Sequence, residues 1–176
     1  MLLLDWISEV TDEFGLKRET YHLAAYYVDR YLTLQFCPVN ELQLLGAGSL
    51  LLASKSEEIF CPRVRDFAFA TDNGFTGDAI IEMEQRILSI LQFRIQPITV
   101  HYIANFICNK WDDFFNENQF EVLQEILPDD APIFKSERYE DYRKFKSYMQ
   151  AVDLLVLDLE TFSYEKYDLA LAAFVI

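Results

Sequence analysis

A run of apolar and small side chains from Leu42 to Ala53 limits what this chain can fold into more than any other feature. Only Gln43 and Ser49 interrupt the run, so a helix built from it is apolar or small on every side. Such a helix lies at the centre of a bundle, with other helices packed around it. Gly46 and Gly48 lower its helix propensity, and the expected gain is a close approach of neighbouring helices. The run therefore predicts an all-α fold with this segment at its centre.

Helical spacing of apolar residues predicts four more helices around the central one. The predicted helices cover residues 1–14, 18–34, 41–58, a short segment after Pro62, and 76–91. Asn40 with Gln43 three residues later is typical of a capping box at the start of the central helix. Pro62 suits the first turn of the fourth helix, and Thr76 suits the N-cap of the fifth. Five helices with one at the centre make a complete small domain, which we place at residues 1–95.

The remaining residues, 96–176, predict a partial second helical domain. A helical pattern covers 98–111, resumes around 148–159, and ends in a segment capped by Ser163 that resembles the central helix in its small and apolar side chains. Residues 112–143 carry ten acidic side chains against three basic ones, so we expect a solvated insertion there with little helix. The second bundle stops where the chain stops, which predicts a fragment of a longer protein.

The charge balance limits the partners of the chain. There are 15 Lys and Arg against 29 Asp and Glu, which gives a formal net charge of −14. Such a surface repels nucleic acid and anionic lipid, so the pattern favours basic partners. The longest apolar run is shorter than the roughly 18–20 residues that a bilayer span needs, and no secretory leader is recognisable. We therefore expect a soluble, intracellular protein.

Neither the cysteines nor the histidines form a pattern that indicates chemistry. Cys37, Cys61 and Cys108 are far apart, which predicts free thiols in a reducing compartment rather than a disulfide frame or a zinc site. His22 and His101 are too few and too isolated for a metal centre. No phosphate-binding loop, nucleophile elbow or zinc-protease motif is present, so the sequence predicts no enzyme and no cofactor.

Two opposite charges stand in apolar stripes of two predicted helices. Lys55 falls on the stripe of the central helix that also holds Leu51, and Glu84 projects between Ile80 and Ile87 on the fifth helix. Leaving either charge alone in the interior would cost several kcal/mol, so we expect the two to pair. One interpretation is a structural salt bridge between the helices. The other is a pair held near the surface, able to offer hydrogen-bond groups to a partner protein.

The first helix carries a second candidate site. Leu2, Trp6, Glu9 and Glu13 share a stripe beside the core-facing side. Two large apolar side chains that lead into two carboxylates would form a groove for a peptide with one apolar and one basic residue. The alternative is a tryptophan packed in the core with solvated acids beside it, and the pattern does not separate the two.

The motifs that contain these residues resemble the cyclins, most of all the G1/S type such as cyclin E, and then cyclin A. The segment "LLLDWISEV" is similar to the family's opening motif MRAILxDWLxEV, and "LKRETYHLAAYYVDRYL" is similar to its second helix. The segment "LQLLGAGSLLLASKSEEIF" resembles the central helix with its KxEE ending, and "FAFATDNGFTGDAIIEMEQRILSILQFRI" resembles the fourth and fifth helices. The similarity is dense over residues 1–107 and returns more weakly near the end of the chain.

The resemblance implies a fold and a function. The implied fold is the cyclin fold, with a five-helix cyclin box around a central helix and a partial second box. The implied function is that of a non-catalytic regulatory subunit, which binds and activates a cyclin-dependent serine/threonine kinase, helps recruit substrates and controls the cell cycle, at the G1/S transition. The implied location is the nucleus and cytoplasm, without direct binding to nucleic acid or membrane. The alternative is a cyclin-fold transcription adaptor resembling transcription factor IIB, but such proteins grip DNA and the acidic charge argues against that.

The resemblance also assigns roles to residues. Two charged residues match the family's pair that meets the kinase helix controlling the active site, and six neighbours match other kinase contacts: Lys55 and Glu84, then Leu52, Leu88, Phe93, Glu57, Glu58 and Ile59. A second set matches the groove that docks Arg-x-Leu motifs of substrates and inhibitors: Leu2, Leu3, Trp6, Glu9, Leu42 and Gln43.

The sequence departs from the family pattern at three places. The family's Met-Arg pair would precede Met1, which implies that Asp29 lacks the buried arginine that usually pairs with it. Ser56 stands where an apolar kinase-contacting residue is common, which implies a weaker contact there. The acidic segment 112–143 implies an insertion or a divergence in the second box.

Overall fold

The protein is represented by a computed structural model that describes residues 2–116, 148–155, 157 and 164–175. The chain forms two compact units, Met1–Thr99 and Val100–Ile176, and each is described separately below. All regular secondary structure in the described ranges is helical, which confirms the predicted all-α class. No helix in those ranges has both the length and the apolar character needed to cross a membrane.

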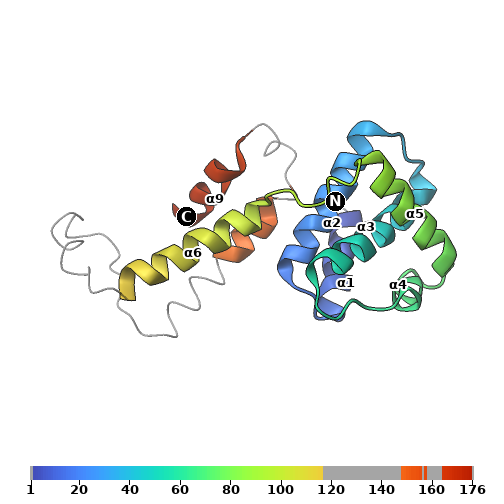
Figure 1. The fold of residues 1–176 in the computed structure, drawn as a ribbon, viewed down its shortest axis with the longest axis horizontal. Helices are drawn as coiled ribbons and strands as arrows, with labels where there is room; N and C mark the ends of the chain where they lie inside the picture. Colours follow the sequence, from blue (N-terminus) through green and yellow to red (C-terminus); the bar gives the residue numbers. More distant parts are fainter. Residues whose placement is uncertain (1, 117–147, 156, 158–163, 176) are drawn as a thin grey trace. The chain divides into compact units, whose positions relative to one another are not determined.

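The first unit is a helical bundle around one central helix (Figure 1). Its elements are α1 (Leu2–Glu13), α2 (Arg18–Leu34), the short 3-10 helix η1 (Val39–Glu41), α3 (Leu42–Glu57), α4 (Val64–Ala70) and α5 (Gly77–Ile90). Helix α3 contacts α1, α2, α4 and α5, and every residue from Leu45 to Ser54 is buried. The prediction that the apolar run lies at the centre of the bundle is confirmed.

Two glycines of α3 allow its neighbours to approach. A Cβ atom added at Gly46 would lie 2.8 Å from Cδ1 of Leu3 on α1, and one added at Gly48 would lie 2.9 Å from Cγ of Met83 on α5. Both distances are shorter than real Cβ atoms show, so a larger residue at either position requires a neighbour to shift: at Gly46 the end of the Leu3 side chain, and at Gly48 the inner part of Met83 beside the backbone of α5. The predicted role of these glycines in close helix packing is confirmed.

One predicted helix cap is present and one is wrong. The side-chain oxygen of Thr76 accepts the backbone N–H of Ala79 at 3.2 Å, as expected for the N-cap of α5. The predicted capping box of Asn40 and Gln43 does not form. Residues 39–41 make a 3-10 turn instead, and Glu41 is the N-cap of α3 without a side-chain hydrogen bond.

The start of α4 also differs from the prediction. Pro62 lies before the helix and not in its first turn, because Arg63 is the N-cap and Val64 is the first helical residue. The carboxylate of Asp66 accepts the backbone N–H of Arg63 at 2.8 Å and so holds the first turn. A carboxylate three residues into a helix is a common way of satisfying this N–H, and here it takes the place of a proline at the first position.

Three tyrosines of α2 anchor the core of the first unit. Tyr21, Tyr27 and Tyr31 are among the largest fully buried side chains. The hydroxyl of Tyr27 donates a hydrogen bond to the carbonyl oxygen of Ile95 at 2.5 Å, which fastens the segment after α5 to α2. Burial raises the pKa of Tyr27 to about 12, so the hydroxyl remains a donor over the physiological range.

The second unit contains α6 (Val100–Asn116), a helix over residues 148–155 and α9 (Lys166–Val175). Their buried side chains form one cluster: Ala104, Cys108, Tyr148, Val152, Ala170 and Ala173. Residues 112–116, at the start of the insertion predicted for 112–143, are helical and end α6. The rest of that insertion, from 117 on, and the predicted cap at Ser163 lie outside the described residues.

Candidate protein-interaction sites

Lys55 and Glu84 form an ion pair between α3 and α5. The ammonium nitrogen of Lys55 lies 2.8 Å from Oε1 and 2.7 Å from Oε2 of Glu84. Gly48 makes this approach possible, because a Cβ atom there would lie 3.3 Å from the backbone nitrogen of Glu84. The expectation that these two charges meet is therefore met.

The two partners of this pair differ in their contact with water. The side chain of Glu84 is 7% exposed, whereas that of Lys55 is 47% exposed. The carboxylate is thus held inside the bundle by the ammonium, and the outer side of the ammonium remains available at the surface. This geometry is compatible both with a structural bridge and with a charged group offered to a partner.

Exposed apolar side chains follow the ends of both helices that carry the pair. Ile59 and Phe60, just after α3, are 85% and 90% exposed, and Phe93, just after α5, is 73% exposed. Gln92 and Phe93 have φ values of 52° and 57°, a left-handed conformation that non-glycine residues adopt at a cost. The chain therefore holds a large aromatic ring in water on a strained backbone, which is typical of a binding surface.

The other predicted kinase contacts differ in accessibility. Leu88 is half-buried on α5 and retains some exposed surface. Leu52 is only 4% exposed and belongs to the core of the bundle, so it offers little surface in this structure. Its assigned role as a contact stays a prediction.

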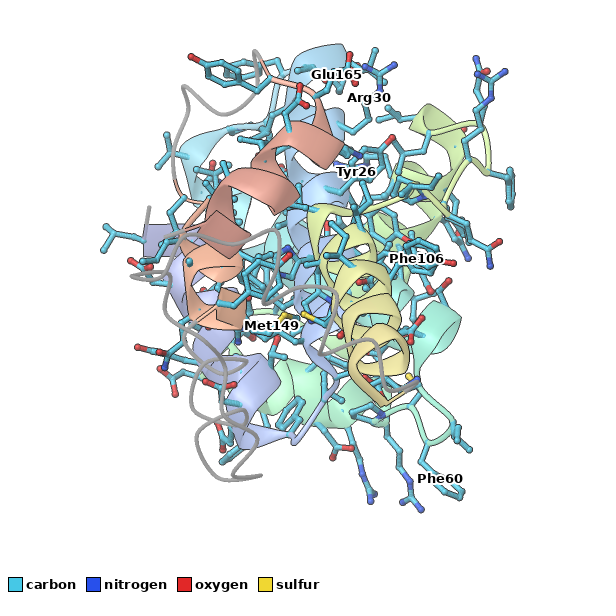
Figure 2. All side chains as sticks on the ribbon, turned by 90° about the vertical axis from the view of Figure 1, so that its left-hand side faces the viewer. Tyr26, Arg30, Phe60, Phe106, Met149 and Glu165 are labelled. Carbon is cyan, nitrogen blue, oxygen red and sulfur yellow. The ribbon has the colours of Figure 1, made fainter. Side chains whose placement is uncertain are left out.

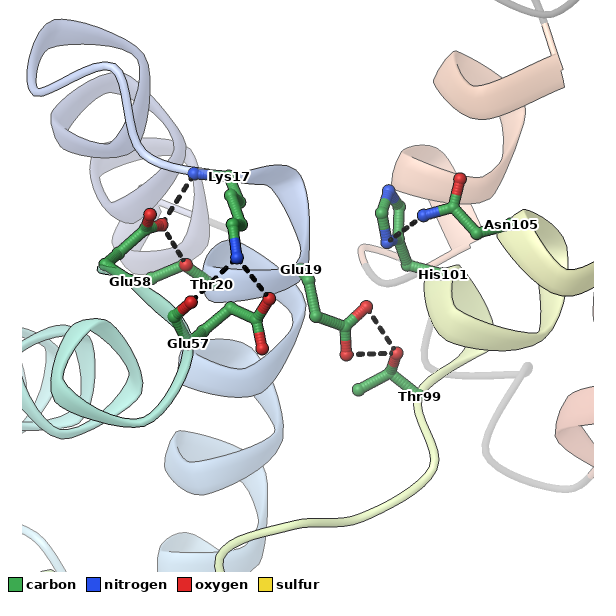
Figure 3. A network of polar contacts seen from close by, with 8 residues as sticks. All are labelled: Lys17, Glu19, Thr20, Glu57, Glu58, Thr99, His101 and Asn105. Carbon is green, nitrogen blue, oxygen red and sulfur yellow. Dashed lines mark hydrogen bonds and ion pairs between the residues drawn. The ribbon is translucent and has the colours of Figure 1, made fainter. Parts of the chain in front are cut away.

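Glu57 and Glu58 take part in contacts within the bundle (Figure 3). The ammonium of Lys17 donates to the backbone oxygen of Glu57 at 2.8 Å and to its carboxylate at 2.9 Å. The carboxylate of Glu58 accepts the backbone N–H of Lys17 at 2.7 Å and the hydroxyl of Thr20. These contacts join the end of α3 to the start of α2, so both acids have a structural use besides any role at an interface.

The hydrogen bond between the Lys17 ammonium and the Glu57 carboxylate affects the titration of Lys17. The hydrogen bond to Glu57 raises the pKa of Lys17 above its usual value, although the lysine side chain is half exposed. Near the same end of α2, the hydroxyl of Thr99 lies 2.7 and 2.9 Å from the two carboxylate oxygens of Glu19 (Figure 3). The start of α2 therefore gathers polar contacts from the end of α3 and from the last residue of the first unit.

The residues of the predicted docking groove lie on α1 and at the start of α3. Leu2 is 89% exposed and Glu9 is exposed, whereas Leu3, Leu42 and Gln43 are half-buried. Gln43 and Leu42 stand in the first turn of α3. The set thus combines open apolar surface with a carboxylate, and its role as a docking groove stays a prediction.

Trp6 is neither fully packed in the core nor fully exposed in a groove. Its ring edge, at Cζ3, is 3.2 Å from the Cβ position of Gly46, so one side of the indole packs on α3. The residue as a whole is only half-buried, so the other side remains accessible. The structure therefore fixes the ring in place without enclosing it.

Asp29 on α2 lies in an environment that disfavours a charged carboxylate. Burial raises its pKa from 3.8 to about 6. Within the described part of the chain, no hydrogen bond or ion pair joins its carboxylate to another side chain. Ser56, the other departure from the family pattern, is half-buried beside Lys55 in the last turn of α3.

The sequence interpretation did not single out two residues that the structure brings forward. The first is Phe60. It stands after a helix end and before a Cys-Pro pair, where an aromatic residue has little chance of burial, and this position is the signal that could have identified it. The second is Lys17. Its partners Glu57 and Glu58 are about forty residues away in the sequence, so no local spacing indicates the contact.

Comparison with known proteins agrees with this architecture. Residues 1–96 match the family model "Cyclin, N-terminal domain". Cyclin-A3-2 of rice (Oryza sativa subsp. japonica) is 44% identical over 99 residues, which cover 56% of this chain and 26% of the relative. The G1/S-specific cyclin-E of Hemicentrotus pulcherrimus is 34% identical over 175 residues, which cover 98% of this chain and 38% of the relative.

A solved structure extends the similarity to the fold. A viral cyclin from herpesvirus saimiri superposes with a TM-score of 0.73 at 17% identity, covering 98% of this chain and 65% of that one. The chain spans between about a quarter and two fifths of the length of the two curated relatives named above. The family model covers more than half of the chain, and the helical bundle agrees with it. The chain belongs to the cyclin family.

Proposed function

We propose that this chain is the regulatory, non-catalytic part of a complex with a cyclin-dependent serine/threonine kinase, which it binds and activates. The observation that supports this most is the half-exposed ammonium of Lys55, fixed at 2.7 Å from the buried carboxylate of Glu84. Ile59 and Phe93 are exposed apolar residues after the two helices that carry the pair. A charged group held in place near exposed aliphatic and aromatic side chains is the usual composition of an interface centre.

The proposed mechanism is conformational. A regulatory subunit that binds one state of its kinase more tightly shifts the kinase toward that state by the difference in binding free energy. The relevant state has the kinase's own Lys–Glu pair and activation segment in place. The cell-cycle stage we propose is the G1/S transition, which the similarity to a cyclin E over almost the whole chain supports. We propose the nucleus and cytoplasm as its location.

Replacing Lys55 tests this proposal. Lys55→Ala should weaken kinase binding by at least ~2 kcal/mol, as expected for the centre of an interface. The variant's own stability should fall by less than that. The measurement is calorimetric titration of a cyclin-dependent kinase captured from extract, together with thermal unfolding.

Arg86→Ala is the matched control. Arg86 lies on α5, two residues after Glu84, and forms a separate ion pair with Glu41 at 3.3 Å. It should leave the affinity unchanged. Equal affinity of the Lys55 variant and the wild type, with a collapse of stability, would mean that the pair is only structural. Binding to bare duplex DNA instead of a kinase would favour the transcription-adaptor alternative.

We also propose that the groove of Leu2, Leu3, Trp6, Glu9, Leu42 and Gln43 docks Arg-x-Leu motifs of substrates and inhibitors. Leu2 and the open side of Trp6 offer apolar surface for a leucine, and the exposed Glu9 offers a carboxylate for an arginine. A short peptide has few contacts, so its affinity should be on the order of micromolar. The arginine contribution should weaken with salt, since Glu9 is exposed.

Trp6→Ala should abolish binding of such a peptide and slow phosphorylation of substrates that carry the motif. Phosphorylation of a short peptide without the motif should not change, because that peptide needs only the kinase active site. The comparison of the two substrates in one assay is the measurement. If both slow equally, Trp6 serves the core and not a docking site.

A further inference from the structure

The connection between α3 and α4 exposes apolar and basic side chains together. We call its residues Ile59, Phe60, Arg63 and Arg65 the α3–α4 surface; all four are exposed. Figure 2 shows Phe60 extending away from the ribbon. Arg63 is the third residue after Phe60, so their backbones are at most about 11 Å apart. An aromatic side chain and two guanidinium groups are therefore within reach of one short peptide segment.

Both arginines are available to a partner. In the described part of the chain no ion pair involves Arg63. Nε of Arg65 lies 3.7 Å from Oδ1 of Asp66, and both side chains are well exposed, so water screens this contact. The other oxygen of Asp66 already accepts the backbone N–H of Arg63. Internal acids thus neutralise little of the charge of these two side chains.

Helix stability does not account for the two arginines. Arg63 is the N-cap of α4, and Arg65 lies in its first turn. The N-cap prefers Ser, Thr, Asn or Asp, and the positive end of the helix dipole disfavours cations. Two positive charges at the beginning of a seven-residue helix therefore weaken it slightly, and a role outside the bundle explains them better.

Nearby acids leave the surface open to an anion. Glu57 and Glu58 precede it in the chain, but Lys17 binds the carboxylate of Glu57, and the Glu58 carboxylate accepts two hydrogen bonds. Ile59 belongs both to the α3–α4 surface and to the residues proposed to contact the kinase, and it is exposed. The α3–α4 surface is thus continuous with the surface proposed to bind the kinase.

We propose that the α3–α4 surface binds an anionic segment of the partner kinase, in which a phosphate or carboxylate group lies beside an apolar residue. Arginine binds either anion through paired N–H donors, and Ile59 and Phe60 would take the apolar neighbour. A protein segment fits better than nucleic acid or lipid, because it brings one local anionic group to the two arginines, whereas a polyanion or an anionic lipid surface would bring many negative charges to a chain whose formal net charge is −14. This inference rests on the proposed kinase binding and adds the chemistry of the partner at one part of that interface.

The test compares the effect on kinase affinity of replacing the arginines of the α3–α4 surface with that of replacing an arginine elsewhere on the first unit. Arg63→Gln/Arg65→Gln should bind the kinase roughly threefold to tenfold more weakly, with a shallower salt dependence, as expected for charges at the edge of an interface. Arg30→Gln is the control, because Arg30 is an exposed arginine of α2 without an ion pair in the described ranges. It should bind as the wild type does. Arg63→Lys/Arg65→Lys should recover the salt dependence, and circular dichroism should show equal helix content in all variants.

Each titration is done with the kinase phosphorylated on its activation segment and again after phosphatase treatment. An effect of the Arg63→Gln/Arg65→Gln change that is confined to the phosphorylated kinase identifies a phosphate, and an equal effect on both forms identifies carboxylates. Unchanged affinity and salt dependence with both forms would overturn the inference while leaving the proposed function intact. If the wild-type chain binds no kinase, the proposed function fails and this inference fails with it.

Discussion

Glu84 and Asp29 are carboxylates in two regions of the same helical bundle, and they differ in burial and in whether a cation lies beside them. Glu84 lies deep between α3 and α5, with the ammonium of Lys55 at 2.7 Å. Asp29 lies on α2, is less buried, and has no partner side chain in the described part of the chain. Burial raises the pKa of Asp29 to about 6. A carboxylate placed inside this protein therefore needs a cation beside it to offset the hydration that burial removes.

The largest expected effect comes from removing the charge of Asp29. Its folded-state pKa lies above its unfolded value, so its contribution to stability is complete below pH 3.8 and is lost as the pH rises through about 6. The rise in pKa corresponds to a loss of about 3 kcal/mol at neutral pH. Asp29→Asn should therefore raise the free energy of unfolding by up to that amount at pH 7.5 and have little effect at pH 4. Urea unfolding at the two pH values measures it.

Glu82→Gln is the control for this experiment, since Glu82 is an exposed carboxylate on α5. It should change stability little at either pH. A stabilisation by Asp29→Asn that is the same at pH 4 and pH 7.5 would show that the charge of Asp29 is not the cause.

The Lys55–Glu84 pair should give the next largest effect. Lys55→Met leaves a buried carboxylate without its cation and should lower the free energy of unfolding by about 1–2 kcal/mol, less than for a fully enclosed pair because the lysine is half exposed. Lys55→Met/Glu84→Gln should recover most of the loss, because no unpaired charge remains. A double-mutant cycle from urea unfolding measures the coupling. If the double variant is as unstable as the sum of the single ones, the two groups are not coupled.

A smaller effect is expected for a buried hydroxyl in the central helix. Ser49 and Ser54 are both fully buried in α3; the hydroxyl of Ser54 donates to the carbonyl of Leu50 at 2.7 Å, whereas that of Ser49 has no partner among the described residues. Ser49→Ala should stabilise the protein by up to about 1 kcal/mol, because it removes an unsatisfied polar group. Ser54→Ala is the matched control and should be neutral or slightly destabilising. Thermal unfolding of both variants measures the effect. A melting temperature of Ser49→Ala below that of the wild type would refute this expectation.

The fold was readable from the sequence because its main signals are local. The spacing of apolar residues identified the helices of the first unit, and the uniformly apolar run identified the central one. Thr76 as a cap also followed from residues within one turn. The capping box at Asn40 failed for a related reason: a cap also depends on the path of the preceding chain, and here residues 39–41 make a 3-10 turn.

The candidate sites were readable in part. The placement of Lys55 and Glu84 in apolar stripes was enough to predict that they pair, since each charge needed a partner and each helix offered one. The contacts of Lys17 with Glu57 and Glu58 were not readable, because exposed charges have many alternative partners and the chain brings these together from about forty residues apart. The burial of Leu52 could not be predicted either, because a helix that is apolar on every side does not show which side faces the surface.

The sequence by itself predicted an all-α fold around a helix at residues 42–53, and the pairing of Lys55 with Glu84 between two of its helices. The tertiary structure decided which charges are sheltered from water, which aromatic rings remain exposed, and where Phe93 adopts a left-handed backbone. The physical reason is that helix periodicity is set by neighbours within one or two turns. Desolvation and the choice of an ionic partner depend instead on which helices the fold brings together.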